Sequence, residues 1–343
     1  MTLRLTATQP TVGAGYAKGL LDFAVSKQAR LDALLARSGI SDEDLADLDN
    51  RIPFEKYKAL MRAGIELTRD PALALHFGED VDFAELSVVG LIALASDTLF
   101  HAFTETNRYN GLVVQVDGVA PGRRFQLVHE PGKTWLVDTR TDANSFPELT
   151  ESGWARMVCG TRRFIPEGRV LVKEVHVTHA APAYRAEYDR IFRVPTVFSS
   201  ERNALLIDET LMFTKVARTT RYAFGVLSEH AKALLDSLER ATTTRGRVES
   251  ILIPMLHRGE PSIDEVANEM GFSHQTLYRK LKAEQVTFEK LLDELRHRMA
   301  LHYLNGKKVS VSEAAYLVGF SESSAFSRAF KRWTGTSPRK RPK

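Results

Sequence analysis

The chain reads Ser262-Ile-Asp-Glu-Val-Ala-Asn-Glu-Met-Gly-Phe-Ser273 and, 48 residues later, Ser310-Val-Ser-Glu-Ala-Ala-Tyr-Leu-Val-Gly-Phe-Ser321. The two stretches share serine, glutamate, alanine and a final Gly-Phe-Ser at matching positions. After the turn the second copy is one residue longer, because Leu277 and Arg279 match Phe326 and Arg328 at a separation of 49. This repeat predicts two helix-turn-helix motifs, each with two short helices joined by a tight turn.

Each copy contains the residues that start and stop short helices. Serine followed three residues later by glutamate, the pattern of a capping box, opens both copies. In the first copy, apolar residues at i, i+3, i+4 and i+7 form one helix face: Ile263, Val266, Ala267 and Met270. A glycine then stands where a tight turn needs a positive φ, and a serine is positioned to cap the next helix: Gly271 and Ser273, then Gly319 and Ser321.

The second helix of each copy places polar side chains opposite its apolar face. These are His274, Gln275, Tyr278, Arg279 and Lys282 in the first copy, and Glu322, Ser323, Ser324, Ser327, Arg328 and Lys331 in the second. Arginine can bind guanine through two hydrogen bonds, glutamine can bind adenine in the same way, and serine suits several base edges. Other basic residues suit phosphates, and we expect this role for His274, Lys282, Lys331, Arg339 and Lys340.

A long helix is expected between the two motifs. Apolar residues recur there at near-helical spacing: Phe288, Leu291, Leu292, Leu295, Met299 and Leu304. Such a helix would be a rigid spacer that holds the two recognition helices about 34 Å apart, the distance between successive major grooves on one face of DNA. The pattern therefore predicts an all-α DNA-binding module in which one molecule reads two major grooves.

The charge distribution supports a polyanionic partner for this module alone. The formal net charge of the chain is +4, but residues 244–343 hold 18 Lys and Arg against 11 Asp and Glu. The rest of the chain holds 29 against 32. A basic segment beside a slightly acidic body is typical of nucleic-acid-binding proteins, although a solvated basic face would give the same counts.

Cysteine and hydropathy indicate the compartment. The chain has one cysteine, Cys159, so no internal disulfide can form and a reducing compartment fits. No run approaches the roughly 18 apolar residues that a membrane span requires, and the N-terminus lacks the apolar core of a signal peptide. We expect a cytoplasmic protein with no membrane partner.

The first 222 residues have the mixed pattern of an α+β domain. Apolar residues at helical spacing predict helices that end at Gly39, follow Pro53, and cover residues 71–78 and 86–103. Alternating or β-branched segments predict strands at 112–116, 125–129, 134–139 and 170–178, with a helix at 147–162.

An amphipathic helix at residues 223–244 ends in a small polar cluster at 241–246, which we take as the domain boundary. This helix could be a simple connector or part of a dimer seam, and the sequence leaves both open. We therefore expect an α+β ligand-sensing and dimerisation domain at 1–222, a linker helix at 223–244, and a double helix-turn-helix domain at 245–343.

The run Gly319-Phe-Ser-Glu-Ser-Ser-Ala-Phe-Ser-Arg-Ala-Phe-Lys-Arg-Trp-Thr-Gly-Thr-Ser-Pro338 resembles the C-terminal signature of the AraC/XylS family of bacterial transcription regulators. The resemblance spans residues 245–340. One departure is Arg341, where the family commonly has a tyrosine. In that family the exposed recognition-helix positions contact bases, which implies base contacts for Gln275, Tyr278, Arg279, Ser323, Ser324, Ser327 and Arg328.

Less specifically, residues 1–222 resemble the arabinose-binding-like ligand domain carried by a subset of these regulators, with 72–78 as the best local match. The resemblance implies a small-molecule effector of unknown identity, a homodimer, RNA polymerase as a partner and activation of transcription. The name of the domain implies no preference for sugars.

Two other classes of protein are weighed against a ligand-responsive regulator. For an enzyme, Gly13-Ala-Gly15 with Gly19 resembles a nucleotide loop, but no strand is expected before it. His176 and His179 should lie on opposite faces of a strand, so a shared metal ion is not expected. We expect no catalysis and no cofactor. A purely architectural DNA-binding protein would not need a body of this size.

The residues of an effector pocket are left unassigned. Aromatic residues of the body could line a pocket or simply form the core: Phe125, Trp135, Phe146, Trp154, Phe164, Tyr184, Tyr188, Phe192 and Phe198. Arg162, Arg163 and Arg185 lie among apolar neighbours and could hold a carboxylate, but solvent-facing charge is the simpler interpretation.

Overall fold

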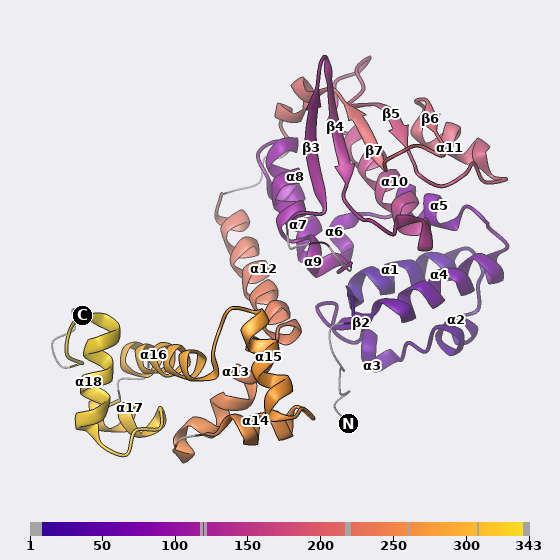
Figure 1. The fold of residues 1–343 in the computed structure, drawn as a ribbon. Coiled ribbons are helices and arrows are strands. Elements are labelled where there is room, and N and C mark those ends of the chain that lie inside the picture. Colours follow the sequence, from indigo (N-terminus) through magenta and orange to yellow (C-terminus); the bar gives the residue numbers. More distant parts are fainter. Residues whose placement is uncertain are drawn as a thin grey trace. The chain divides into compact units, whose positions relative to one another are not determined.

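A computed structural model of the chain describes residues 9–116, 119, 122–216, 221–259, 261–306 and 309–338. The chain divides into two compact units, Met1–Leu235 and Asp236–Lys343 (Figure 1). The first unit combines helices with two sheets, and the second consists of helices in its described residues, as the sequence predicts. Across the described ranges, no helix has both the length and the hydropathy needed to traverse a lipid bilayer.

The first helices of the chain pack around α1 (Ala14–Ser26) and α4 (Phe54–Thr68), in which Tyr16 and Tyr57 stack with ring centroids 5.5 Å apart. The predicted stop at Gly39 is confirmed, because α2 (Leu31–Ser38) ends there with φ of 68°. The helix expected after Pro53 is α4, and the one expected at 71–78 is α5 (Leu73–Asp80).

A two-stranded sheet was not expected at the start of the chain. Strand β1 (Thr11–Gly13) pairs antiparallel with β2 (Arg51–Pro53), so a strand does precede the glycines that resemble a nucleotide loop. These glycines have a packing role. A Cβ on Gly15 would lie 2.1 Å from the carbonyl oxygen of Leu86, so the missing side chain lets α6 (Phe83–Leu86) approach α1 closely.

The main sheet has the strand order β3-β4-β7-β5-β6, in which only β5 and β6 run parallel. The strands are β3 (Phe125–Glu130), β4 (Lys133–Asp138), β5 (Val172–His176), β6 (Thr196–Val197) and β7 (Ala204–Ile207). Predictions at 125–129, 134–139 and 170–178 are confirmed by β3, β4 and β5. The run Ala-Leu-Leu-Ile that forms β7 was missed, although four adjacent apolar residues are a usable strand signal.

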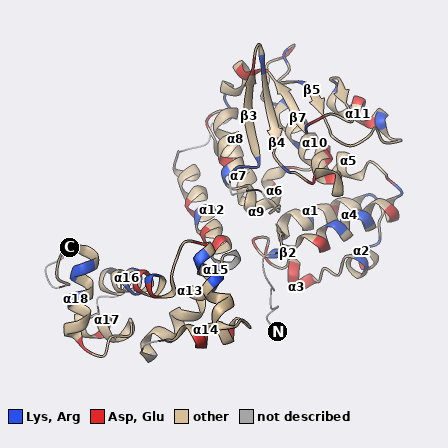
Figure 2. Cartoon of the chain, viewed as in Figure 1, with Lys and Arg blue, Asp and Glu red and all other residues tan. Residues whose placement is uncertain are grey.

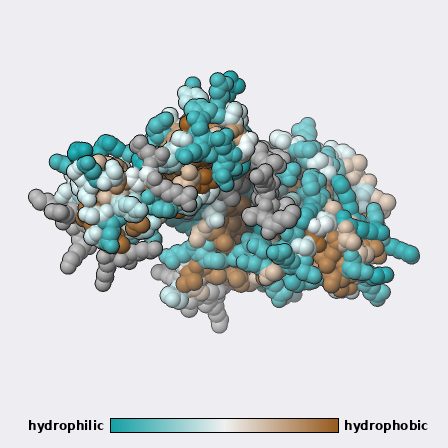
Figure 3. Space-filling model, turned by 90° about the horizontal axis from the view of Figure 1, so that it is seen from below, coloured by the Kyte–Doolittle hydropathy of each residue, from teal (hydrophilic) through white to brown (hydrophobic). Residues whose placement is uncertain are grey.

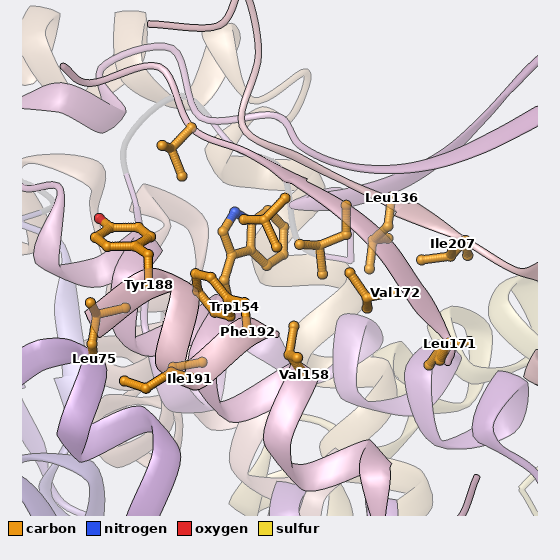
Figure 4. Close-up of a cluster of buried hydrophobic side chains, with 14 of the residues drawn as sticks. Leu75, Leu136, Trp154, Val158, Leu171, Val172, Tyr188, Ile191, Phe192 and Ile207 are labelled. Carbon is orange, nitrogen blue, oxygen red and sulfur yellow. The ribbon is translucent and has the colours of Figure 1, made fainter. Parts of the chain in front are cut away.

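Helices cover one face of this sheet. Trp154 and Val158 of α10 (Glu148–Arg162) pack there against Leu136 and against α11 (Arg185–Phe192), as Figure 4 shows. Because side chains alternate along a strand, Trp135 and Leu206 point to the opposite face and form a smaller cluster. The helix expected at 147–162 is α10, whereas α11 was not predicted.

Two predictions in the first unit were wrong in detail. Residues 112–116 do not form a strand: α9 (Asn110–Val113) turns there, and Val114 makes an isolated bridge to Val12. Burial of Leu112 and Val113 outweighs their strand propensity. The stretch 86–103 is broken into α7 (Val88–Ala95) and α8 (Leu99–Arg108), each capped by a hydroxyl side chain.

The second unit contains two helical cores joined by one long helix. The first core is built from α13 (Thr244–Met255), the single turn η3 (Leu256–Arg258), α14 (Ile263–Glu269) and α15 (His274–Ala283). The second is built from α17 (Val311–Leu317) and α18 (Ser323–Thr334). Helix α16 (Phe288–Gly306) supplies apolar side chains to both cores, and Met299 packs against each, so the long helix predicted between the motifs is confirmed.

Candidate nucleic-acid interface

The first helix-turn-helix motif has every local feature that its sequence predicts. Ser262 and Glu265 form both hydrogen bonds of the capping box at the start of α14. Gly271 makes the turn with φ of 71°. The hydroxyl of Ser273 then accepts the backbone N–H of Thr276 at 3.2 Å and caps α15. Helix α15 is therefore held in place at its start by its own N-cap and along its length by Leu277 and Leu281 in the core.

The second motif repeats the capping box and the turn but not the cap. Ser310 and Glu313 form the box, and hydrogen bonds from the backbone and side chain of Ser310 lower the pKa of Glu313. Gly319 has φ of 84°. The prediction that Ser321 caps the recognition helix was wrong. Since this copy is one residue longer, α18 starts at Ser323 with Glu322 as N-cap, and no side chain caps it.

The first recognition helix exposes the residues expected to contact bases. Gln275, Tyr278 and Arg279 are exposed, and in the part of the chain that the structure describes their side chains form no hydrogen bond or ion pair. The expected phosphate contact Lys282 is exposed too, whereas Nδ1 of His274 lies 2.8 Å from a carboxylate oxygen of Asp264. Figure 2 shows Lys and Arg residues on α15 and acidic residues on α14.

The second recognition helix is less open. Arg328 and Lys331 are exposed and Ser327 is half-buried, and none of the three has a side-chain partner among the described residues. The other two expected base contacts are engaged. The hydroxyl of Ser323 donates to that of Ser312 at 3.1 Å, and the hydroxyl of Ser324 donates to Glu322 at 3.0 Å. Arg339 and Lys340, expected at phosphates, lie outside the described residues.

The second motif contacts α16 and the turn before the first motif at what we call the Gly319 junction, formed by Gly319, Phe320, Arg296, Leu256 and Gly259. A Cβ on Gly319 would lie 2.4 Å from the carbonyl oxygen of Leu256 and 2.7 Å from that of Gly259. Arg296 of α16 donates to the same Gly259 carbonyl at 3.3 Å and lies over the Phe320 ring at 5.2 Å. The junction therefore fixes the second motif against the first.

Two glutamates also link helices of this unit through hydrogen bonds, and the sequence analysis predicted neither contact. Glu284, which ends α15, accepts the backbone N–H groups of Thr244 and Arg245 at 2.7 and 2.9 Å, at the start of α13. Glu249 is only 4% exposed and accepts from Arg245 at 3.0 Å and from Arg298 of α16. Glu249 and Arg245 form a local i,i+4 pair on α13. No local pattern marks the other contacts, because Glu284 and Thr244 lie 40 residues apart in the sequence and Glu249 and Arg298 lie 49 apart.

Comparisons with known proteins decide the family. A sequence model described as the arabinose-binding domain of AraC transcription regulators, N-terminal, matches residues 29–216, and one described as a helix-turn-helix domain matches residues 254–341. This chain belongs to the AraC family. It is a DNA-binding transcription regulator with an arabinose-binding-type N-terminal domain.

Relatives of this AraC-type regulator match along different parts of it. An ornithine utilization regulator of Pseudomonas aeruginosa is 26% identical over 340 residues, which cover 97% of each chain. The regulator VirS of Mycobacterium tuberculosis is 33% identical over 233 residues, 63% of this chain and 67% of VirS. The transcriptional activator RhaS of Escherichia coli is 41% identical over 81 residues, 23% of this chain and 29% of RhaS.

The histidines considered as metal ligands in this AraC-type regulator serve other contacts. Nδ1 of His176 lies 3.0 Å from the Ser200 hydroxyl, and Nε2 of His179 lies 3.1 Å from the Tyr188 hydroxyl. Over the described ranges, no group of three or more His, Cys, Asp or Glu residues is arranged to hold a metal ion.

Proposed function

We propose that this AraC-type regulator is a sequence-specific, ligand-responsive activator that reads DNA with both recognition helices. Base contacts are assigned to Gln275, Tyr278, Arg279, Ser323, Ser324, Ser327 and Arg328, and phosphate contacts to His274, Lys282, Lys331, Arg339 and Lys340. In this proposal residues 1–222 sense the effector and dimerise, residues 223–244 link, and residues 245–343 bind DNA.

One observation carries the DNA-reading part of the proposal. Arg279 and Arg328 occupy matching positions of the repeat, and both side chains are exposed and unpaired among the described residues. An arginine held on a packed helix with its guanidinium free can form the two-hydrogen-bond contact to guanine. Ser323 and Ser324 would have to exchange their present partners for bases, so they contribute less discrimination than the arginines.

Effector control is proposed to work by a shift between two populations of the protein. A ligand that binds one arrangement of the domains more tightly would favour that arrangement, and the linker helix would transmit the change. Activation through RNA polymerase is supported by the similarity to RhaS, which is itself named an activator.

Exposed apolar residues of the first unit support a homodimer. Figure 3 shows hydrophobic areas among the hydrophilic residues of one face of the molecule. Phe100 and Phe213 are exposed and stack on each other at 5.8 Å. Tyr222 and Val226, one turn apart on α12 (Arg221–Thr242), are 81% and 50% exposed. Exposed apolar side chains that cluster on a helix favour a protein interface.

The dimer is tested by sedimentation of the full chain. Val226→Glu should shift the protein towards monomer, because a charge at an apolar interface must be desolvated. Lys232→Glu, at an exposed position of the same helix, serves as the matched control. A wild-type chain that sediments as a monomer at every concentration would remove this part of the proposal.

The DNA-reading function is tested by selecting binding sites for the full chain from random DNA. We expect each molecule to select two half-sites with centres about 34–36 Å, or 10–10.5 base pairs, apart. Selection of one half-site only would contradict reading by both motifs.

The sign of regulation is tested by transcription in vitro with purified RNA polymerase and the selected site. Transcription should increase on addition of the regulator and its effector, and a decrease would make it a repressor.

A further inference from the structure

A cavity of about 420 Å³ lies inside the first unit, between the helix-covered face of the main sheet and helices α7, α8 and α10. Its volume falls within the range of about 300–1,000 Å³ that is usual for small-molecule sites. Exposed residues of its wall, Asp80, Asp82 and Arg163, show where the cavity reaches the surface. The cavity is the natural place for an effector in this unit.

Most of the cavity wall is apolar. The sheet contributes Phe125, Leu136, Leu205 and Ile207, and α8 contributes Leu99 and Phe103. On α10 the wall contains two glycines, Gly153 and Gly160, and a Cβ built at either would meet no atom within 4 Å. A ligand must therefore bury an apolar body here, because a polar body would lose its hydrogen bonds to water without replacement.

Arg156 is the exception in this wall. Its side chain is half-buried, and its guanidinium carbon lies 4.5 Å from the ring centroid of Phe83 and 5.2 Å from that of Tyr16. One Nη donates to the Tyr16 hydroxyl at 2.7 Å. Over the part of the chain that the structure describes, no carboxylate forms an ion pair with Arg156. Contacts with two rings and one hydrogen bond thus hold the guanidinium in place, while its other N–H donors have no protein partner among the described residues.

The pKa of Tyr16 reflects this unneutralised charge. Burial by itself would raise the pKa of Tyr16, but the charge of Arg156 and the hydrogen bonds from Ser152 and Arg156 lower the pKa below its ordinary value. The field of Arg156 therefore favours a negative group beside it.

The other charged residues of the wall are engaged or exposed. Glu79 accepts hydrogen bonds from Arg190 at 3.0 and 2.6 Å, and Asp82 caps α6 by accepting the backbone N–H of Ala84 at 3.0 Å. Arg163 and Asp80 are exposed. A single half-buried positive charge in an apolar wall matches one negative charge, whereas a doubly charged ligand would bury charge without compensation.

The arginines that the sequence analysis considered for a carboxylate lie in different surroundings, and Arg163 is an exposed residue of the cavity wall. Arg162 donates to the Phe192 carbonyl, and Arg185 lies over the Phe198 ring at 5.9 Å. Among the aromatic residues considered for a pocket, Phe125 and Phe164 line the cavity, whereas Trp154 belongs to the core.

We propose that this cavity binds a monocarboxylate with an apolar body. The carboxylate accepts two hydrogen bonds from Arg156 between the rings of Tyr16 and Phe83, and the body lies against the sheet and α8. This inference rests on the proposed effector control and specifies the chemistry of the effector. An alcohol of the same shape lacks the charge that Arg156 selects, and an amine carries the wrong sign.

The ligand class is tested by calorimetric titration of the full-length protein with octanoate, 1-octanol and octylamine. These probes share a chain and differ in the head group. Octanoate should bind at least about tenfold more tightly than the other two, as expected for a charge-assisted hydrogen-bonded pair. Equal or tighter binding of the alcohol or the amine overturns the proposal, and so does a failure of octanoate to bind.

Substitutions of the two wall arginines test which residue binds the carboxylate. Arg156→Gln should weaken octanoate binding about 10- to 100-fold. Arg156→Lys keeps the charge without the fork and should fall between. Arg163→Gln, at the exposed arginine of the same wall, should change the affinity less than about threefold, since exposed charge pairs contribute little. A larger loss in Arg163→Gln than in Arg156→Gln overturns the assignment of Arg156.

The third test is a substitution that fills the cavity with a side chain. Gly153→Leu should abolish octanoate binding, whereas Gly225→Leu on α12, where a Cβ also meets no atom within 4 Å, should not change it. Unchanged binding to Gly153→Leu overturns the cavity as the site. If these octanoate experiments fail but another metabolite changes the DNA binding of the full chain, the proposed function is still supported. The proposed function falls only if the site selection fails or no effector alters DNA binding.

Discussion

The two helix-turn-helix motifs share a capping box and a turn glycine, yet the glycine has a different role in each. Gly271 faces open space, with no atom within 4 Å of an added Cβ, whereas Gly319 packs against the backbone carbonyls of Leu256 and Gly259, just before the first motif. The first recognition helix has a serine cap, and the second has no side-chain cap. The comparison teaches that identical residues of a repeat can be needed for different reasons, one local and one long-range.

The largest effect is expected from the two glycines. Gly319→Ala should destabilise the second unit by about 2–5 kcal/mol, since alanine at positive φ costs about 1–2 kcal/mol and overpacking against backbone about 1–3 more. Gly271→Ala should cost only the first part, about 1–2 kcal/mol. Urea unfolding of the full chain, followed through helix content, measures both. Equal losses would mean that the Gly319 junction does not hold the motifs together.

The matching arginines test whether both motifs read bases. Arg279→Ala and Arg328→Ala should each weaken binding to the selected site by about 1–3 kcal/mol, with far less effect on random DNA. Fluorescence anisotropy with the two DNAs measures the difference. If Arg328→Ala weakens both DNAs equally, the second motif only positions the protein, and the two motifs have divided their roles.

Substitutions of the serines after the two turns should differ in their effect on stability, although both serines follow a Gly-Phe pair. Ser273→Ala removes the cap of α15 and should cost about 1 kcal/mol of stability. Ser321→Ala should remain within about 0.5 kcal/mol of the wild type, because α18 does not start on it. Thermal unfolding of both variants checks this. A substantial loss in Ser321→Ala would show that Ser321 does cap its helix.

The smallest effect is expected from the exposed lysines, and here the motifs should behave alike. Lys282→Ala and Lys331→Ala should each reduce the slope of log affinity against log salt concentration by about one, on every DNA sequence. Affinity measured at several salt concentrations gives the slope. A changed sequence preference in either variant would turn that lysine from a phosphate contact into a base contact.

The sequence was sufficient wherever the cause of a structure is local. Both capping boxes, both positive-φ glycines, the stop at Gly39 and the long helix α16 follow from short spacings, and the structure confirms them. Helix α13 was missed because the polar cluster before it was interpreted as a boundary only. In fact Thr243 caps this helix.

The remainder could not be predicted because it depends on contacts between distant segments. The Gly319 junction joins residues some 60 positions apart, and no residue spacing within either motif predicts this contact. For the same reason Arg156 escaped notice. It lies in an apolar stretch of α10, and only the fold brings the rings of Tyr16 and Phe83 close to its guanidinium. Apart from the half-buried Ser327, the assigned base-contact residues are exposed, and this exposure was predictable because it follows from helical periodicity alone.

Helix α16 has a consequence for folding. Its side chains complete two separate cores, and Met299 packs against both. If either core opened alone, part of the apolar face of α16 would be left in water, at a cost of about 25 cal/mol for each Å² exposed. Because both cores share helix α16, they should unfold together in one cooperative transition. The two motifs then behave as a single folding unit.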